Sequence, residues 1–290
     1  MVRHRAYCPE SLPPVVISMG DIRVLTQLER DRQVSEHWDA QARAGTVTRD
    51  AILKQLEMRH IRQHVRDGMR VCDAGCGDGT TLIYLASLFP DCELVGFDES
   101  PEMVKVARRM AGVMGVSGQV TIYEGSVLDP PSEIRSSYPR QVGDWFDLVY
   151  TERVLINLPD WKTQAKALDA LWGLKSPTGT LLCVESCQDG LDRLNDLRRR
   201  MDLPLIVPPW HNRYVRAHEM RDAMLVRPTV ADFSSSYYFL SRIVNARLTK
   251  DEVGEGVEPS YDAPVNQLAL DLPPIAEGYG QTWSWSWRMP

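Results

Sequence analysis

A glycine-rich turn behind an apolar segment constrains this 290-residue chain more than any other feature. The run Met69–Ala74 is apolar enough for a buried strand, and a helix is expected to begin near Thr80. Between them lie Gly75, Gly77 and Gly79. Glycine has no Cβ, so the backbone of such a turn approaches a ligand closely, and the first N–H groups of the following helix are unpaired. The segment predicts a nucleotide-type binding turn in an α/β fold.

Three other interpretations of this turn fit the residues less well. A phosphate-binding P-loop has Lys-Ser/Thr directly after its last glycine, whereas this chain has Thr80-Thr81. A dinucleotide fingerprint has the spacing G-x-G-x-x-G, whereas the spacing here is G-x-G-x-G. The carboxylate of Asp73 at the strand end would repel a pyrophosphate but suits an ammonium group. A purely structural tight turn is the remaining alternative.

The acidic residue and the glycines together resemble motif I of the class I S-adenosylmethionine (SAM) dependent methyltransferases, D-x-G-x-G-x-G. The resemblance covers roughly residues 65 to 187 and implies SAM as cofactor and S-adenosylhomocysteine as product. It extends more loosely to bacterial small-molecule and natural-product methyltransferases. The cofactor contacts that it implies in this turn are those of Asp73, Gly75, Cys76, Gly77 and Gly79.

A second apolar run, Glu93–Phe97, is followed directly by Asp98, Glu99 and Ser100. In doubly wound sheets the acid that ends the second strand accepts hydrogen bonds from ribose hydroxyls, and Asp98 is expected in that role. Glu99 is a further cofactor candidate, and a solvated acidic cap is the alternative for Asp98. Ser100 should cap the next helix, with Pro101 in its first turn.

The alternation of strands and helices predicts an α/β fold, a doubly wound, Rossmann-like, seven-stranded and mostly parallel sheet. The last two strands are expected to be an antiparallel pair, with an N-terminal helical cap and an inserted helical lid completing the fold. Trp283, Trp285 and Trp287 recur at period two, which predicts one core-facing stripe. The remaining expected strands are Gln119–Tyr123, Phe146–Tyr150, Thr180–Ser186, Ser234–Leu240 and Gln281–Arg288, and the best helix is Trp161–Leu174.

Four segments are expected along the chain. They are an N-terminal helical cap (1–66), the cofactor-binding core (67–187), a substrate lid (188–230) and C-terminal antiparallel strands (231–290).

Further cofactor contacts follow from the resemblance. Ser126 stands where the family often has an acid for the adenine amino group, and Val127 is next to it. Thr151 follows the fourth strand, where the family places the methyl group opposite the substrate. Arg49, near the start of a helix expected over Ala51–Val65, could bind the SAM carboxylate bidentately, or could simply be solvated.

Composition limits the partners and the compartment. A net charge of −6 argues against a duplex or tRNA partner, since phosphate binding needs concentrated positive charge. No run approaches 18 apolar residues, so no membrane span is expected. The six cysteines lack paired metal-ligand spacing, which predicts no metal site and a reducing, cytoplasmic compartment. A homodimer is possible.

The acceptor is expected between the N-terminal region and the segment after the fifth strand. A proline-rich loop there should roof the site, because prolines stiffen loops. The predicted substrate contacts are Trp38, Glu185, Trp210, Asn212 and Tyr214.

A hydroxyl acceptor must be aligned with the methyl group and must lose its proton. His211 is the expected base, because the unperturbed histidine pKa is about 6.5. A packing role is its alternative, and Glu152 is the second candidate. The predicted reaction is methylation of a hydroxyl on a sugar, cyclitol or secondary metabolite. Carbon, nitrogen or carboxylate methylation, and SAM binding without methyl transfer, remain open. The run after the fourth strand lacks the N/D-P-P-Y/F typical of protein or rRNA nitrogen methylation.

Overall fold

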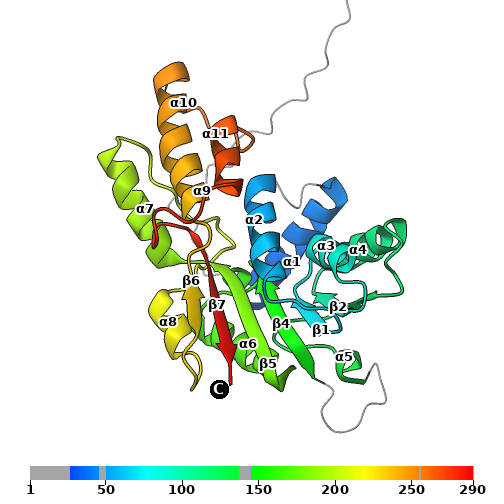
Figure 1. Cartoon of the computed structure of the whole chain (residues 1–290). Helices are drawn as coiled ribbons and strands as arrows, with labels where there is room; N and C mark the ends of the chain where they lie inside the picture. The colour runs from blue at the N-terminus through cyan, green and yellow to red at the C-terminus, as the bar shows by residue number, and fades with distance from the viewer. Residues whose placement is uncertain (1–26, 46–49, 137–144, 255, 290) are drawn as a thin grey trace, which may run out of the picture.

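The computed structural model describes residues 27–45, 50–136, 145–254 and 256–289 (Figure 1). Within these residues the chain forms one seven-stranded sheet in the order β3-β2-β1-β4-β5-β7-β6. The strands are β1 (Arg70–Ala74), β2 (Glu93–Asp98), β3 (Val120–Glu124), β4 (Phe146–Glu152), β5 (Lys175–Ser186), β6 (Thr229–Ala231) and β7 (Thr282–Arg288).

Strands β1 to β5 pair in parallel, and β7 is antiparallel to both of its neighbours, β5 and β6. The fold class predicted from the sequence, with its antiparallel end, is confirmed. Because β1, β2, β4 and β5 run in the same direction, their carboxyl ends meet at one edge of the sheet. The residues that follow these strands therefore share that edge, as they do in other doubly wound sheets.

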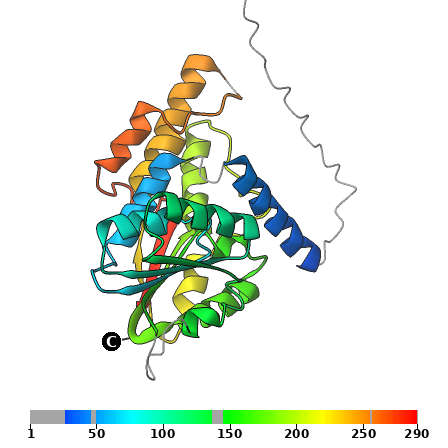
Figure 2. The same cartoon turned by 90° about the vertical axis from the view of Figure 1, so that its right-hand side faces the viewer.

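Helices cover both faces of the sheet (Figure 2). Helices α2, α3 and α4 pack on one face, and α5, α6 and α8 pack on the other. The helices are α1 (Gln27–Ala44), α2 (Ala51–Arg62), α3 (Thr80–Leu88), α4 (Pro101–Val113), α5 (Glu133–Ser136), α6 (Trp161–Trp172), α7 (Gln188–Arg200), α8 (Ala217–Asp222), α9 (Ser235–Phe239), α10 (Asn245–Val253) and α11 (Pro264–Gln267), with short 3-10 turns η1 (Leu155–Asn157) and η3 (Leu268–Leu270) and a π-helical turn η2 (Leu240–Val244).

Local sequence signals place several of these elements. The Ser100 hydroxyl accepts a hydrogen bond from the Met103 N–H at 3.1 Å, and Pro101 opens α4, as predicted. Asp50 caps α2 by accepting from the Leu53 N–H at 3.0 Å. These caps satisfy N–H groups that have no partner inside the helix.

The tryptophan stripe of β7 is part of the core. Trp285 and Trp287 are fully buried and Trp283 nearly so, all in the cluster that faces α6 and α8. The prediction that the three tryptophans at period two face the core is therefore confirmed.

One predicted strand is wrong. Residues 234–240 form α9 and the start of η2, and the sixth strand is the short edge strand β6. The helix is held by tertiary contacts of its aromatic side chains, because Tyr237 donates its hydroxyl proton to Asp50 and the Tyr238 hydroxyl lies 2.9 Å from Thr282 Oγ1. The described part of segment 231–290 consequently contains more helix than strand and contributes only one full strand.

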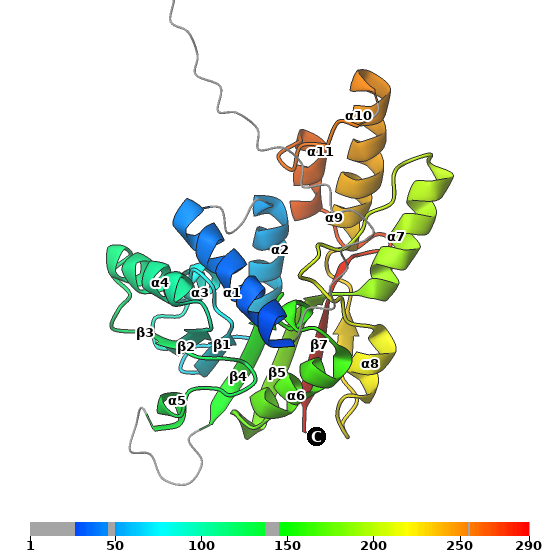
Figure 3. The ribbon, with the colours of Figure 1, turned by 180° about the vertical axis from the view of Figure 1, so that it is seen from behind.

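Helices α7, α9, α10 and α11 extend beyond the carboxyl edge of the sheet (Figure 1). Helix α1 lies beside α4 at the same edge (Figure 3). No helix in the described ranges is long and apolar enough to cross a membrane.

Candidate active site

A cavity of about 1230 Å³ opens at the carboxyl edge of the sheet. One end, the cofactor half, is walled by the glycine turn, the end of β2 and the segment after β3. The other end, the acceptor half, is walled by the end of β4, the loop of residues 202–214 and helices α9 and α10. Helices α1 and α2 contribute to the wall as well.

The glycine turn is fixed to the neighbouring strand. The N–H groups of Gly75 and Cys76 both donate to the Phe97 carbonyl, at 2.7 and 3.0 Å. Gly75 and Gly77 have φ angles of +80° and +53°, in the left-handed region that favours glycine. A Cβ on Gly75 would lie 2.5 Å from a methyl group of Val154, whereas a Cβ on Gly77 would meet nothing within 4 Å. Gly75 is thus required by packing, and Gly77 borders open space.

Asp98 joins β2 to this turn. Its Oδ2 accepts from the Gly77 N–H at 2.8 Å, and its Oδ1 accepts from the Ser100 N–H at 2.9 Å. Burial raises the pKa of Asp98, and these two backbone donors oppose the shift. Glu99 also lines the cavity but is exposed, with its pKa raised by partial burial and then by Asp31.

Asp73 presents a buried oxygen without a partner to the same half. Its Oδ2 accepts from the Tyr150 hydroxyl at 2.7 Å, while Oδ1 has no hydrogen-bond partner among the described residues. Burial, and then the charge of Glu152, raise the pKa of Asp73 to about 8. A buried acceptor of this kind needs a donor or a cation, which a bound ligand can supply.

The other cofactor residues predicted from the sequence divide into two groups. Cys76 and Val127 line the cavity. Ser126, Thr151 and Gly79 do not. Ser126 accepts from the Leu128 N–H at 3.3 Å, and Thr151 is fully buried. Gly79 precedes α3, and a Cβ there would lie 3.0 Å from the Ala107 Cβ. Arg49 lies outside the described residues.

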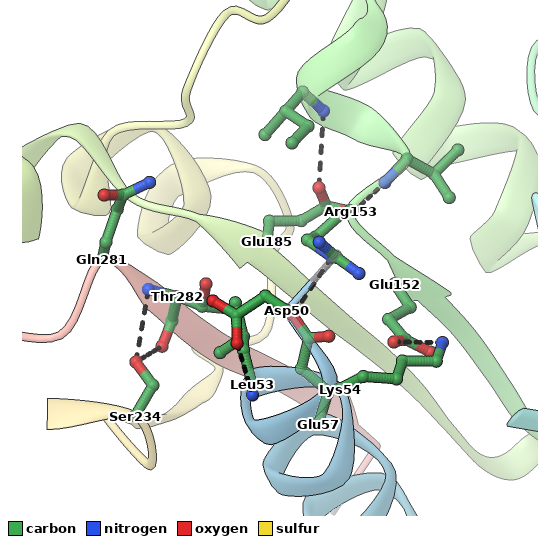
Figure 4. Close-up of polar contacts among 12 residues, drawn as sticks. Asp50, Leu53, Lys54, Glu57, Glu152, Arg153, Glu185, Ser234, Gln281 and Thr282 are labelled. Atoms are coloured by element: carbon green, nitrogen blue, oxygen red, sulfur yellow. Dashed lines mark hydrogen bonds and ion pairs between the residues drawn. The ribbon is translucent and has the colours of Figure 1, made fainter. Parts of the chain in front are cut away.

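Glu152 lies at the junction of the two halves, in a buried ion pair (Figure 4). Its Oε1 accepts from the Lys54 ammonium at 2.6 Å, and its Oε2 accepts from the Thr81 hydroxyl at 2.7 Å. Burial alone would raise the pKa of Glu152, but the charges of Lys54 and Arg153 outweigh it and lower the pKa. A carboxylate engaged in this way is a weak proton acceptor.

Glu185, a predicted substrate contact, instead organises the turn after β4. It is fully buried, and its Oε1 accepts from the Thr151 hydroxyl at 2.7 Å and from the N–H groups of Val154 and Leu155, both at 3.1 Å. Burial raises the pKa of Glu185 to about 7, with these donors opposing the shift. Glu185 does not line the cavity, because its oxygens are used inside the protein.

The proline-rich loop and α1 meet over the cavity. Arg30 of α1 donates to the His211 carbonyl at 3.2 Å, and the rings of His37 and His211 lie 4.6 Å apart. The His211 side chain lines the cavity, and its Nδ1 has no partner among the described residues. Burial, followed by the charges of His37 and Arg30, lowers the pKa of His211 to about 4.

Of the remaining predicted substrate contacts, three line the cavity and one does not. Trp38, Asn212 and Tyr214 are in the wall, and the Tyr214 hydroxyl accepts from Gln281 Nε2 at 2.8 Å. Trp210 is outside the wall with 59% of its surface exposed, and its indole packs edge-on against His211.

Several wall residues were not singled out from the sequence, namely Lys54, Arg153, Ser186, Tyr238, Arg242 and Gln281. Arg153 follows Glu152 directly, so the end of β4 was a local signal for it. Tyr238 and Arg242 lie on α9 and η2, in and beside the segment predicted as a strand, and that error hid them.

Comparisons with known proteins agree with this geometry. A family model described as a methyltransferase domain matches residues 65–206. The chain belongs to the class I SAM-dependent methyltransferases. It is 27% identical over 182 residues to a demethylmenaquinone methyltransferase of Lactiplantibacillus plantarum, covering 59% of this chain and 67% of the relative. A trans-aconitate 2-methyltransferase of Methylobacterium radiotolerans is 32% identical over 109 residues, or 38% of this chain and 35% of the relative.

Solved structures show the fold of this methyltransferase and no more. The [4+2]-cyclase SpnF has a TM-score of 0.51 and 16% identity over 81% of this chain and 80% of its own. A chain from the complex of a methyltransferase with the Haloferax volcanii Trm112 activator has a TM-score of 0.51 and 20% identity, over 87% of this chain and 97% of its own.

SAM is the cofactor, and the cofactor half suits it. The unpartnered Asp73 Oδ1 offers an acceptor to an ammonium group, and the open side of Gly77 leaves room beside the turn. Within the described residues, no group of three or more metal-ligating side chains comes together.

Proposed function

We propose that this methyltransferase transfers a methyl group from SAM to an oxygen of a small molecule, a hydroxyl of a sugar, cyclitol or secondary metabolite. The observation that carries the proposal is the continuity of the cavity. A single cavity runs from Asp73 and Gly77 to a polar chamber walled by His211, Asn212 and Tyr214. Its volume, about 1230 Å³, can hold both a nucleoside-sized cofactor and a small acceptor.

In this proposal, Asp73, Gly77, Asp98 and Val127 hold the cofactor. Bound SAM supplies an electrophilic methyl group, so the protein has no covalent step of its own to perform. The wall residues exclude water and align the acceptor oxygen, since a reacting pair held in line gains several kcal/mol, about 7–11 in the best intramolecular cases.

A proton must also leave a hydroxyl acceptor. His211 is the better placed of the two bases predicted from the sequence, because its Nδ1 is unpartnered among the described residues whereas both oxygens of Glu152 are occupied. The pKa of His211, lowered to about 4, keeps its imidazole neutral at pH 7, so a ring nitrogen is free to accept a proton, as a weaker base than an ordinary histidine. Trp38 and Tyr214 are proposed to contact the acceptor.

Calorimetry with SAM and an acceptor screen read by product mass test the proposal. Wild-type protein should bind SAM, and Asp98→Ala should bind it more weakly by about 1.5–3 kcal/mol, the range for a hydrogen bond to a charged group. Asp169→Ala, an exposed acid on α6, is the matched control and should bind like wild type.

The screen should then yield a product about 14 mass units heavier than its acceptor, which is the mass of one added CH₂ group. One S-adenosylhomocysteine should form for each molecule of product. Binding of SAM without any methylated product from hydroxyl acceptors would contradict methyl transfer to a hydroxyl. Conversion of an acceptor to a product while SAM keeps its methyl group would indicate that the protein catalyses another reaction.

We also propose a cytoplasmic location. The cysteines in the described ranges, Cys72, Cys76, Cys92, Cys183 and Cys187, are all free and buried, as in a reducing compartment.

We also propose that the protein forms a homodimer. Sedimentation of the purified protein would determine its oligomeric state.

A further inference from the structure

The basic residues of the cavity wall lie toward one of its two ends, whereas its acidic residues lie along the whole wall. In the wall formed by the described residues, the basic side chains are confined to the acceptor half and its junction, and the cofactor half carries only acids. The basic residues are Lys54, Arg153, Arg198, Arg242 and Lys250, and the acids of the cofactor half are Asp31, Asp73, Asp78, Asp98 and Glu99. The acceptor half and the junction also carry four acids, namely Asp50, Glu152, Asp202 and Glu258.

Three of the five basic groups already have strong partners. These pairs are Lys54 with Glu152 at 2.6 Å, Lys250 with Asp202 at 2.8 Å, and Arg198 with the Pro204 carbonyl at 2.6 Å. Arg153 and Arg242 differ from them, because their guanidinium groups form no hydrogen bond with a described residue.

Arg153 is held in place by a strained but well-supported backbone. Its φ of 58° is in the left-handed region, which costs a non-glycine residue on the order of 1 kcal/mol or more. The Arg153 N–H donates to the Val184 carbonyl at 2.8 Å, and its carbonyl accepts from Asn157 Nδ2 at 3.0 Å. The Glu185 carboxylate holds the next two N–H groups. Strain that the surroundings enforce so strongly is characteristic of functional positions.

The guanidinium of Arg153 lines the cavity and is paired with Glu57, and the charge of Glu152 acts on it as well. Its Nε lies 3.1 Å from Glu57 Oε1, and the Arg153 side chain retains 33% exposure while Glu57 is completely buried (Figure 4). Glu57 sits behind Arg153, on α2, and does not line the cavity. The open side of the guanidinium is therefore available to a ligand.

Arg242 faces the same chamber from η2. Its nearest acid is Asp50 at 3.7 Å, and Asp50 already accepts from the Leu53 N–H and from the Tyr237 hydroxyl. The Arg242 guanidinium lies 4.8 Å from the ring centre of Tyr261. Aromatic support of this kind orients a guanidinium without using its N–H groups.

Arg153 and Arg242 line the same cavity as Tyr214, and the charges of both act on the Tyr214 hydroxyl. Burial raises the pKa of Tyr214, and the charges of Arg242 and Arg153 both oppose the shift. Tyr214, Arg153 and Arg242 are all in the cavity wall, together with Gln281, which donates to the Tyr214 hydroxyl.

We propose that the acceptor carries an anionic oxygen group, a carboxylate or a phosphate, and that Arg153 and Arg242 bind it. This inference rests on the proposed function, since it concerns the acceptor half of the same cavity. Guanidinium groups bind such anions through paired N–H donors, and partial burial strengthens the attraction.

Calorimetric titration of the protein saturated with S-adenosylhomocysteine tests this inference without requiring turnover. The probes are citrate, glucuronate, glucose 6-phosphate and glucose, of which the last three share one ring and differ in charge. The variants are Arg242→Gln and Arg153→Gln. Arg247→Gln is the matched control, because Arg247 pairs with Asp251 on the surface of α10 and does not line the cavity.

At least one acidic probe should bind wild type and Arg247→Gln equally, and bind Arg242→Gln about tenfold or more weakly, as expected for loss of a charge-assisted contact. Arg242→Gln is the primary variant, because Asp50 keeps two other donors, whereas Arg153→Gln leaves Glu57 buried without a cation. Glucuronate and glucose 6-phosphate distinguish a carboxylate from a phosphate.

The inference is overturned if no acidic probe binds, if glucose binds as tightly as its acidic counterparts, or if Arg242→Gln retains wild-type affinity for the acids. Failure of the proposed function has a different signature. Anions would then bind through Arg242 while no acceptor is methylated, whereas methylation of neutral acceptors alone would retain the function and contradict the inference.

Discussion

The Lys54 ammonium and the Glu152 carboxylate lie 2.6 Å apart, with only 15% and 6% of their side chains exposed. This ion pair joins α2 to the end of β4 at the point where the two halves of the cavity meet. Helix α2 is thus part of the site, because its residue Lys54 holds Glu152 at the carboxyl edge of the sheet.

Lys54→Met should destabilise the fold by roughly 3–5 kcal/mol, the usual cost of leaving a buried charge without its partner. Urea unfolding at pH 7 measures this. The double variant Lys54→Met with Glu152→Gln should regain much of the loss, because no unpaired charge remains. Lys166→Met, at an exposed position of α6, is the control. A double variant as unstable as Lys54→Met would contradict this account.

The same pair predicts a dependence of stability on pH. The pKa of Glu152 is lowered in the folded protein, so its contribution is fully present above the ordinary carboxyl value of 4.5 and is lost as the pH falls through the lower, folded value. In Lys54→Met the folded pKa should rise, which moves the acid-induced loss to higher pH. Urea unfolding at a series of acidic pH values compares the two proteins.

Two glycines of one turn should respond differently to alanine. Gly75→Ala should lower stability, because the new Cβ would collide with Val154 at 2.5 Å. Gly77→Ala meets open space and adds only left-handed strain, about 1 kcal/mol, so its effect should appear mainly in SAM affinity. Thermal unfolding and calorimetry separate the two effects. Equal losses of stability in both variants would contradict the assignment.

SAM affinity should rise with pH because of Asp73. The pKa of Asp73 is about 8 in the free protein, so binding of a cationic ligand should lower that pKa and release a proton. Affinity should therefore increase as the pH rises toward about 8 and level off above it. Calorimetry in two buffers of different ionisation enthalpy measures the proton release. Asp73→Asn should abolish the release, and a release unchanged in that variant would assign it to another group.

Asp73 also predicts a stability trend of the opposite sign to that of Glu152. Its folded pKa is raised, so the folded protein holds a proton that the unfolded chain loses above its ordinary value of 3.8. This contribution should be fully present below that value and should be lost as the pH rises through about 8. Asp73→Asn should flatten the trend in unfolding experiments.

The parts of the fold and site that could be predicted from the sequence are those set by local signals. The glycine turn, the cap by Ser100 and the acid that ends β2 are each indicated by residues within a few positions of one another. The tryptophan stripe has the period of a strand, and one buried face accounts for it.

The parts that could not be predicted depend on contacts between distant segments. The helix α9 is stabilised when Tyr237 reaches Asp50, 187 positions away, and no property of residues 234–240 alone indicates this contact. The orientations of the Glu185 and Arg153 side chains could not be predicted from the sequence for the same reason. Their positions at strand ends place both at the catalytic edge, but burial turns Glu185 inward while a left-handed backbone holds Arg153 at the cavity wall.

His211 supplies the last prediction, which concerns the proton that leaves a hydroxyl acceptor. Its imidazole is buried beside His37 and its pKa is about 4, so activity that depends on neutral His211 should stay constant as the pH falls below 6.5 and should decline only near 4. His211→Ala should lower turnover roughly 10²–10⁴-fold with little change in SAM affinity, as expected for loss of a general base. His218→Ala, on the exposed side of α8, is the matched control and should behave like wild type.

Turnover and SAM affinity measured across this pH range distinguish three outcomes. A large loss in His211→Ala, with the acid decline of wild type near pH 4, assigns the base to His211. Near-normal turnover and an unchanged pH profile exclude it, and Glu152→Gln then becomes the decisive variant, since a cofactor or acceptor anchor would alter binding more than turnover. If neither change affects turnover, the acceptor oxygen is already nucleophilic, as a carboxylate is, and alignment in the cavity suffices for the transfer.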